Sequence, residues 1–210
     1  MTDLGGAGRV VVVTGATGTT GRAVAQLLTD RGDSVVAVGT DAARLAEVPA
    51  ADRVVADLVD PDAAARLADT VRQRFGRADG LLHLVGGWKP GWGDEVTDWL
   101  NARLVTTLIN ASSALEPLLL EAPAGRVAIV SSTAVTREGP PTSAYAAAKL
   151  AAESWIEQLA GRWTDGSAAA TSLVVKSIGD NATPPQAIAE RLAGLWDVPA
   201  AELNGHRIRL

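Results

Sequence analysis

The stretch VVVTGATGTTGRAVAQLL, residues 11–28, passes from an apolar run through a glycine-rich turn into an amphipathic segment. Its glycines, Gly15, Gly18 and Gly21, follow the spacing G-x-x-G-x-x-G. Glycine permits a tight turn and lets the backbone approach a pyrophosphate, which then lies at the positive end of the following helix. Because the turn follows the first predicted strand and opens a βαβ unit, it predicts a dinucleotide site. The alternative is a strand-to-helix turn without a ligand.

Around this stretch, short apolar runs alternate with longer amphipathic segments along the whole chain. Runs rich in Val and Leu without strict alternation indicate strands covered on both faces. This order predicts the α/β class, as a doubly wound parallel sheet (Rossmann fold) in a single domain, residues 9–210, after a flexible N-terminus, residues 1–8. The predicted strands are 9–14, 34–39, 53–56, 80–85, 126–131, 171–176 and 206–209. The predicted helices are 20–31, 41–47, 62–75, 97–120, 143–163 and 185–196.

The composition limits the kind of protein. With 210 residues the chain can bury a substantial core, and its net charge of −5 argues against nucleic acid as a partner. The absence of cysteine excludes disulfides and thiolate metal sites, and His83 and His206 lie far apart in sequence, so we expect no metal. The start of the chain, MTDLGGAG, has no basic region and no apolar span. We therefore expect a cytoplasmic protein with no membrane partner.

Two later features fit a dinucleotide. Asp57 follows the third predicted strand, where its carboxylate can accept a hydrogen bond from an adenine amino group. For Asp57 alone, a helix N-cap or a solvated turn is an equal alternative. Gly86 and Gly87 end the fourth predicted strand, where backbone can approach the cofactor.

The segment SAYAAAKLAAES, residues 143–154, contains the only tyrosine of the chain and one of its three lysines. Tyr145 and Lys149 are four residues apart, so both lie on one face of the predicted helix. A lysine ammonium near a phenol favours the phenolate and lowers the pKa of the tyrosine. The pair therefore suggests a proton donor and acceptor, or else an amphipathic surface pair.

From about Val10 to the end, these residues resemble the short-chain dehydrogenase/reductase family. That family has a glycine-rich turn after its first strand, an Asp after the third, a Ser at the end of the fifth and Tyr-x-x-x-Lys on the next helix. Here Ser132, in RVAIVSSTAV, lies thirteen residues before Tyr145. SIGDNATP is similar to the Pro-Gly-x-x-x-Thr stretch of the family, with Gly179 and Thr183 matching.

The resemblance implies an NAD(P)(H)-dependent oxidoreductase that transfers hydride between nicotinamide and a carbonyl, alcohol or C=N bond of a small-molecule substrate. Its catalytic residues would be Ser132, which orients the substrate oxygen, Tyr145, the general acid or base, and Lys149, which also holds the nicotinamide ribose. The implied cofactor-binding residues are Gly15, Thr17, Gly18, Thr19, Gly21, Thr40, Asp57, Leu58, Val85, Gly86, Gly87, Tyr145, Lys149 and Thr183.

The end of the second predicted strand bears on the choice of cofactor. An acid there would bind the ribose 2′-hydroxyl of NAD, and a basic residue the 2′-phosphate of NADP. The chain has Gly39 and Thr40 at these positions, and Arg44 could reach a phosphate or be a solvated helix residue. NADP(H) is therefore slightly favoured over NAD(H).

The chain also departs from the family pattern. Thr19 replaces the middle glycine of the commonest turn, residues 83–86 (HLVG) replace Asn-Asn-Ala-Gly, and Leu104 stands where the catalytic Asn falls. The family's proton relay through that Asn is therefore in question. Two alternatives follow: an enzyme of this fold with non-redox chemistry (isomerase, dehydratase or cyclase), or a non-catalytic cofactor-binding sensor.

Within the family, the chain shows some resemblance to dihydropteridine reductase, in VGGW (residues 85–88) and QLAGRW (residues 158–163). Trp88 and Trp92, in a loop over the predicted crevice, are either substrate walls or apolar anchors. The long helices 97–120 and 143–163 form the interface in many relatives, which implies a homodimer or homotetramer.

Overall fold

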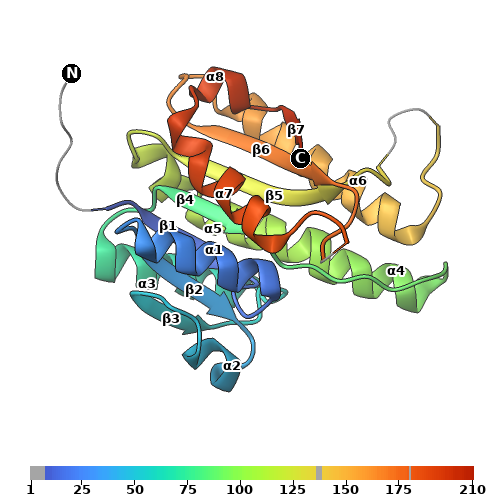
Figure 1. Ribbon diagram of the computed structural model, residues 1–210, viewed down its shortest axis with the longest axis horizontal. Helices are drawn as coiled ribbons and strands as arrows, with labels where there is room; N and C mark the ends of the chain where they lie inside the picture. The colour runs from blue at the N-terminus through green and yellow to red at the C-terminus, as the bar shows by residue number, and fades with distance from the viewer. Residues whose placement is uncertain (1–7, 136–138, 180) are drawn as a thin grey trace.

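The computed structural model describes residues 8–135, 139–179 and 181–210 (Figure 1). Apart from Gly8, the predicted flexible N-terminus lies outside the described residues. The described strands form one sheet in the order β3-β2-β1-β4-β5-β6-β7, and every neighbouring pair is parallel. The strands are β1 (Val10–Thr14), β2 (Ser34–Gly39), β3 (Asp52–Val55), β4 (Gly80–His83), β5 (Arg126–Ser132), β6 (Ala169–Val175) and β7 (Arg207–Arg209).

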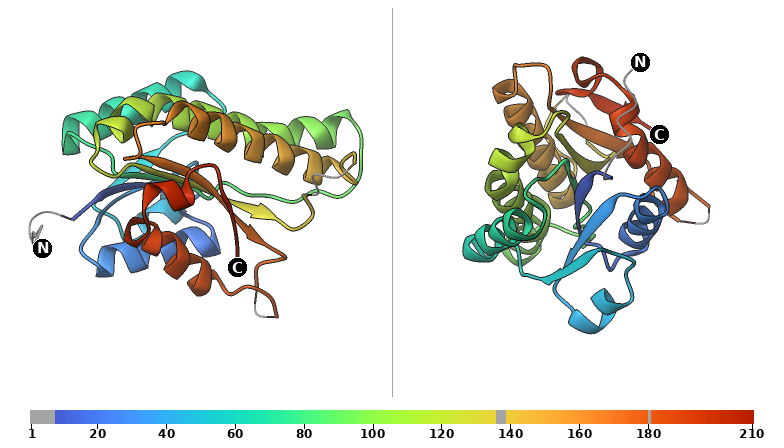
Figure 2. Two further views of the ribbon diagram at one scale, coloured as in Figure 1. Left: turned by 90° about the horizontal axis from the view of Figure 1, so that it is seen from above. Right: turned by 90° about the vertical axis from the view of Figure 1, so that its left-hand side faces the viewer.

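Helices cover both faces of the sheet, which confirms the predicted doubly wound α/β fold (Figure 2). Along β1, Val10 and Val12 pack into one hydrophobic cluster and Val11 and Val13 into another, so the valine run serves both faces. The first face carries α3 (Pro61–Phe75), α4 (Asp94–Asn101), a π-helix η1 (Ala102–Thr106), α5 (Thr107–Glu121) and α6 (Ala144–Arg162). The second carries α1 (Thr19–Asp30), α2 (Ala42–Ala46), α7 (Pro185–Ala193), a 3-10 helix η2 (Gly194–Asp197) and α8 (Ala200–Leu203).

Among the differences between the structure and the predicted elements, three concern the start, the type or the existence of an element. The predicted helix 97–120 begins earlier, at Asp94, and contains η1, where the Thr107 N–H bonds to the carbonyl of Ala102 five residues back. Strand β6 begins at Ala169 rather than at residue 171, because pairing with β5 overrides the weak strand preference of alanine. The four-residue α8 was not predicted, since so short a helix has almost no periodicity.

All strands run in one direction, so their carboxyl ends share one edge of the sheet. Thr14, Gly39, His83, Ser132 and Val175 close their strands at this edge. In the part of the chain that the structure describes, no helix combines the length and apolar character needed to cross a bilayer.

Candidate active site

The glycine-rich turn between β1 and α1 is shaped by backbone contacts. Gly15 has φ +66°, and a Cβ there would lie 2.6 Å from the carbonyl oxygen of Leu84. At Gly21 a Cβ would lie 2.4 Å from the carbonyl oxygen of Gly15. Gly18 has more room, because its Cβ would lie 3.4 Å from that same oxygen. Two of the three glycines are therefore required by the fold of the turn, and Gly18 leaves space toward the groove.

The turn opens onto a groove along the carboxyl edge of the sheet. One part, of about 510 Å³, runs from the glycine turn past the ends of β2 and β3, and the other, of about 350 Å³, reaches Ser132, Tyr145 and Lys149. The two parts share Thr20, Leu84, Val85, Gly86, Gly87 and Ile178, so they are continuous. An extended dinucleotide fits this arrangement, with backbone N–H groups of α1 available for its pyrophosphate.

The larger part of the groove contains the predicted adenosine residues. Thr40, Asp57 and Leu58 all line it. Asp57 is exposed and accepts a hydrogen bond from the Val59 N–H at 3.1 Å, whereas Asp60 forms the N-cap of α3. The N-cap alternative for Asp57 is therefore wrong.

Arg44, which the sequence left between two interpretations, also lines this part of the groove. Its backbone N–H donates to the Asp41 carboxylate at 3.0 Å, which caps α2, and its guanidinium donates to the carbonyl of Thr17 at 3.0 Å. The guanidinium is thus held beside the glycine turn and next to the end of β2.

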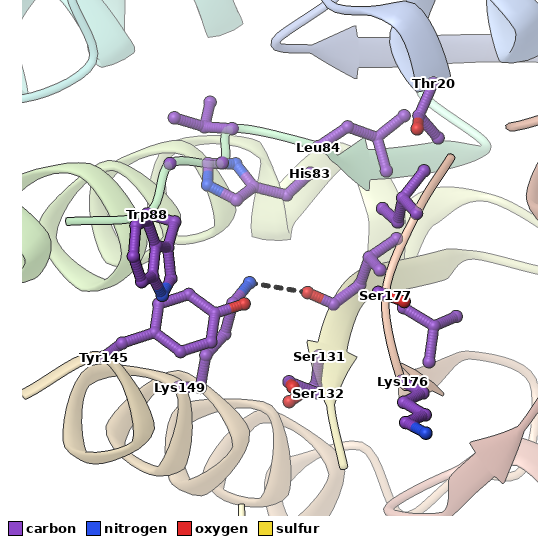
Figure 3. A pocket seen from close by; sticks show the side chains of 16 residues that line it. Thr20, His83, Leu84, Trp88, Ser131, Ser132, Tyr145, Lys149, Lys176 and Ser177 are labelled. Carbon is purple, nitrogen blue, oxygen red and sulfur yellow. Dashed lines mark hydrogen bonds between the residues drawn. The ribbon is translucent and has the colours of Figure 1, made fainter. Parts of the chain in front are cut away.

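The smaller part of the groove brings together the three predicted catalytic residues (Figure 3). Ser132 ends β5, while Tyr145 and Lys149 lie one turn apart on α6, whose N-cap, Ser143, accepts from the Ala146 N–H at 3.1 Å. The Ser132 and Tyr145 side chains both line this part of the groove, and Ser132 contributes to the pKa of Tyr145. The Lys149 ammonium donates to the carbonyl of Val130 at 2.7 Å and lies 5.9 Å from the centre of the tyrosine ring.

The environment of Tyr145 contradicts the expectation that its pKa is lowered. Burial raises the pKa of Tyr145, and the hydrogen bond with Ser132 opposes this shift in part, so the pKa is not lowered by Lys149 as expected. Burial also lowers the pKa of Lys149 to about 8, against the attraction of the Glu153 carboxylate. Near neutral pH the phenol is therefore protonated and the lysine is largely a cation. This state suits the donation of a proton.

His83 forms the floor of the same pocket. It is buried, with Nδ1 2.8 Å from the Thr14 hydroxyl and Nε2 3.1 Å from the Thr107 hydroxyl. The Thr107 hydroxyl donates to the carbonyl of Arg103 in η1 at 2.6 Å, so it accepts from Nε2–H. Burial, helped by Lys149, lowers the pKa of His83 to about 3, and the ring is neutral. The ring of His83, on β4, thus links Thr14 of β1 to Thr107, which bonds to the π-helix.

Every predicted cofactor residue except Thr183 lines the groove, and Gly87 has a second role in packing. Thr183 is not among the lining residues of either part; its N–H bonds to the carbonyl of Ser177 at 3.1 Å. At Gly87 a Cβ would lie 2.6 Å from the Trp99 ring, so packing with Trp99, and not only approach of a cofactor, requires glycine there.

Some lining residues were not predicted. Arg103 and Thr107 line the larger part, and Ile178, at the position of the family proline, lines both. Leu104 stands where the family has its catalytic Asn, so its neighbour Arg103 could have been predicted to lie near the groove. Of the two loop tryptophans, Trp88 lines the catalytic part of the groove and Trp92 does not.

Comparison with known proteins decides the family. A model of the short chain dehydrogenase family matches residues 9–172. The chain belongs to the short-chain dehydrogenase/reductase family. A short-chain type dehydrogenase/reductase of uncharacterized function from Sinorhizobium fredii is 32% identical over 92% of the chain. The chain spans about a third to a half of the length of two curated relatives that it matches, since it covers 36% of this one and 52% of another.

Solved structures of short-chain dehydrogenases share the fold. A metagenomic short-chain oxidoreductase in complex with NADP has a TM-score of 0.82 and 25% identity, covering 97% of both chains. An NAD⁺-bound xylitol dehydrogenase has a TM-score of 0.83 and 18% identity, covering 97% of this chain and 98% of its own. Proteins that share the fold of this short-chain dehydrogenase/reductase have thus been solved with either NADP or NAD⁺.

Proposed function

We propose that this protein is an NAD(P)(H)-dependent oxidoreductase that acts on a carbonyl, an alcohol or a related C=N bond of a small molecule. One observation carries the proposal: a single groove joins the glycine turn to Ser132, Tyr145 and Lys149. A cofactor held by the turn would extend along this groove toward the three side chains. When bound, the nicotinamide supplies or accepts the hydride.

The three side chains have distinct roles in this proposal. Ser132 orients the substrate oxygen through its hydroxyl, which lies in the same part of the groove as Tyr145. Tyr145 gives the proton to that oxygen in reduction and removes it in oxidation. The Lys149 cation holds the nicotinamide ribose and favours the phenolate that remains. Leu104 does not offer the amide of the family Asn, so Ser132, Tyr145 and Lys149 form the core of the site.

Cofactor binding is the first test. NADPH and NADH are titrated separately into the protein, and the nicotinamide fluorescence is followed. We expect micromolar affinity for at least one of them, after which carbonyl compounds can be screened with that reductant. Binding without turnover of any carbonyl or imine would favour a non-redox enzyme or a sensor. No binding of either nucleotide would refute the proposed function.

We infer a preference for NADP(H), supported by the position of Arg44 at the end of the groove near Thr40. Arg44→Ala is expected to weaken NADPH binding about tenfold, because a charge-assisted contact to the 2′-phosphate is lost, and to change NADH binding little. Both affinities are measured by the same titration. Arg31→Ala, an exposed arginine at the end of α1, is the charge-matched control. If the affinities for NADPH and NADH fell equally, Arg44 would only hold the backbone at Thr17 and would not contact the 2′-phosphate.

We further propose a homodimer or homotetramer that pairs through the long helix formed by α4, η1 and α5 and through α6, as implied by the family. Leu120 on α5 is 41% exposed. Sedimentation equilibrium at micromolar concentration should give a mass of two or four chains. A monomer under these conditions would contradict this expectation. The cytoplasmic location expected from the sequence stays a prediction.

A further inference from the structure

The face of α6 that carries Tyr145 and Lys149 continues with a third ionisable residue. Glu153 lies one turn beyond Lys149 and is 1% exposed. A carboxylate is rarely buried to this degree without partners that compensate for the lost hydration. Its surroundings show what these partners are.

Glu153 is bonded to two strands of the sheet. The Ser131 hydroxyl donates to its Oε1 at 2.5 Å. Arg207, on β7, donates to Oε1 at 3.2 Å and places its Nε 2.9 Å from Oε2. The carboxylate therefore connects the catalytic helix with both β5 and β7.

The contacts of Lys149 and Glu153 fall on consecutive residues of β5. Lys149 donates to the carbonyl of Val130, and Glu153 accepts from Ser131. The next residue is Ser132, which lines the same part of the groove as Tyr145. Two successive turns of α6 thus bond to two neighbouring residues of β5, and these bonds hold the helix against the strand next to Ser132.

The charges around Lys149 give the carboxylate a second role. Because His83 is neutral, its imidazole adds no charge, and the Glu153 carboxylate attracts the ammonium. The titratable or charged groups around this pair include Tyr145 and Glu157 on α6, His83 at the end of β4, Lys176 after β6 and Arg207 on β7.

We propose that Glu153 is a positioning residue, whose buried carboxylate holds α6 in register on β5 and keeps Lys149 in its cationic form. The inference rests on the proposed function, since it concerns the residue that supports its general acid. Burial alone would favour the neutral amine of Lys149, and the carboxylate opposes this. Arg207 links the same carboxylate to the last strand.

The protonation of Lys149 can be measured without substrate or cofactor, because the chain has only three lysines. The protein is treated briefly with acetic anhydride between about pH 6 and about pH 10, and mass spectrometry gives the acetylation rate of each lysine, since only the neutral amine reacts. For Glu153→Gln we expect the pH midpoint of the Lys149 acetylation rate to move to lower pH. Lys89 and Lys176 should keep their midpoints.

Two further variants separate charge from contact. Glu153→Asp keeps the negative charge, but its shorter side chain leaves the carboxylate farther from Ser131. The pH midpoint of Lys149 acetylation should therefore stay near that of the wild type. Glu157→Gln removes a carboxylate one turn further along α6 and should also leave it unchanged. A Glu153→Gln midpoint equal to the wild type, in a folded protein, would overturn the proposal. So would a shift of equal size in Glu157→Gln.

A catalytic readout follows once a substrate is found. In the reductive direction kcat/KM of Glu153→Gln should fall about tenfold relative to wild type above about pH 8, with a much smaller loss at about pH 6.5. If kcat/KM fell by the same factor at every pH, Glu153 would only stabilise the fold and would not affect the protonation of Lys149. If the wild type binds no nucleotide the proposed function fails, but the acetylation result still decides the role of Glu153.

Discussion

Replacement of Tyr145 by phenylalanine is expected to lower kcat by about a thousandfold, within the usual range for loss of a general acid. In the proposed mechanism the phenol, which lines the same part of the groove as Ser132, gives its proton to the substrate oxygen. Phenylalanine keeps the ring and its packing but has no proton to give. Turnover is measured with the preferred nucleotide and a carbonyl compound found by screening.

Nucleotide binding is the control for this variant. Since the glycine turn lies on the other side of the groove, Tyr145→Phe should keep its affinity for the reduced cofactor within about threefold, a change of less than 1 kcal/mol. Turnover close to that of the wild type would remove Tyr145 from the mechanism. A protein that binds nucleotide and never turns over a carbonyl, with or without this change, would be a sensor or a non-redox enzyme.

Gly21→Ala should destabilise the protein by about 3 kcal/mol and abolish measurable nucleotide binding. The added Cβ would lie 2.4 Å from the Gly15 carbonyl oxygen and 2.7 Å from the Ala16 Cα, so the backbone of the turn must move. Urea unfolding gives the change in stability, and the fluorescence titration gives the change in affinity.

Gly161→Ala is a matched control, because Gly161 also lies in a helix but a Cβ there meets nothing within 4 Å. We expect this variant to be more stable by about 0.5–1 kcal/mol, the usual gain from alanine in a helix, and to bind nucleotide like the wild type. If Gly21→Ala unfolded at the same urea concentration as the wild type, the turn would be more adaptable than its backbone contacts indicate.

The parts of the fold predicted from sequence are those encoded by local pattern. The valine run of β1, the glycine turn and the Tyr145–Lys149 spacing each lie within a few residues, and the order of strands and helices restricted the topology. The sheet followed from these, whereas the grouping of Ser132 with Tyr145 and Lys149 was implied by the resemblance to the family. Whether each cofactor residue contacts a nucleotide stays a prediction.

The remaining features depend on contacts between distant residues. The hydroxyl of Thr107 bonds to His83 and to the carbonyl of Arg103 in the π-helix of residues 102–106. No local sequence pattern predicts these contacts. The pKa of Tyr145 depends on burial, which its spacing from Lys149 does not reveal. Likewise, Glu153 in the sequence AAES looks like a surface residue, and its burial depends on Arg207, 54 residues further along the chain.

Trp88 has a practical consequence of a different kind. Its indole is 68% exposed and lines the catalytic part of the groove beside Tyr145, whereas Trp163 is buried in the core (Figure 3). Indole emits in the near ultraviolet, where a reduced nicotinamide absorbs. A reductant in this groove would therefore quench Trp88 by resonance energy transfer. The protein thus carries its own optical reporter of site occupancy, and a Trp88→Phe variant would isolate that signal from the other tryptophans.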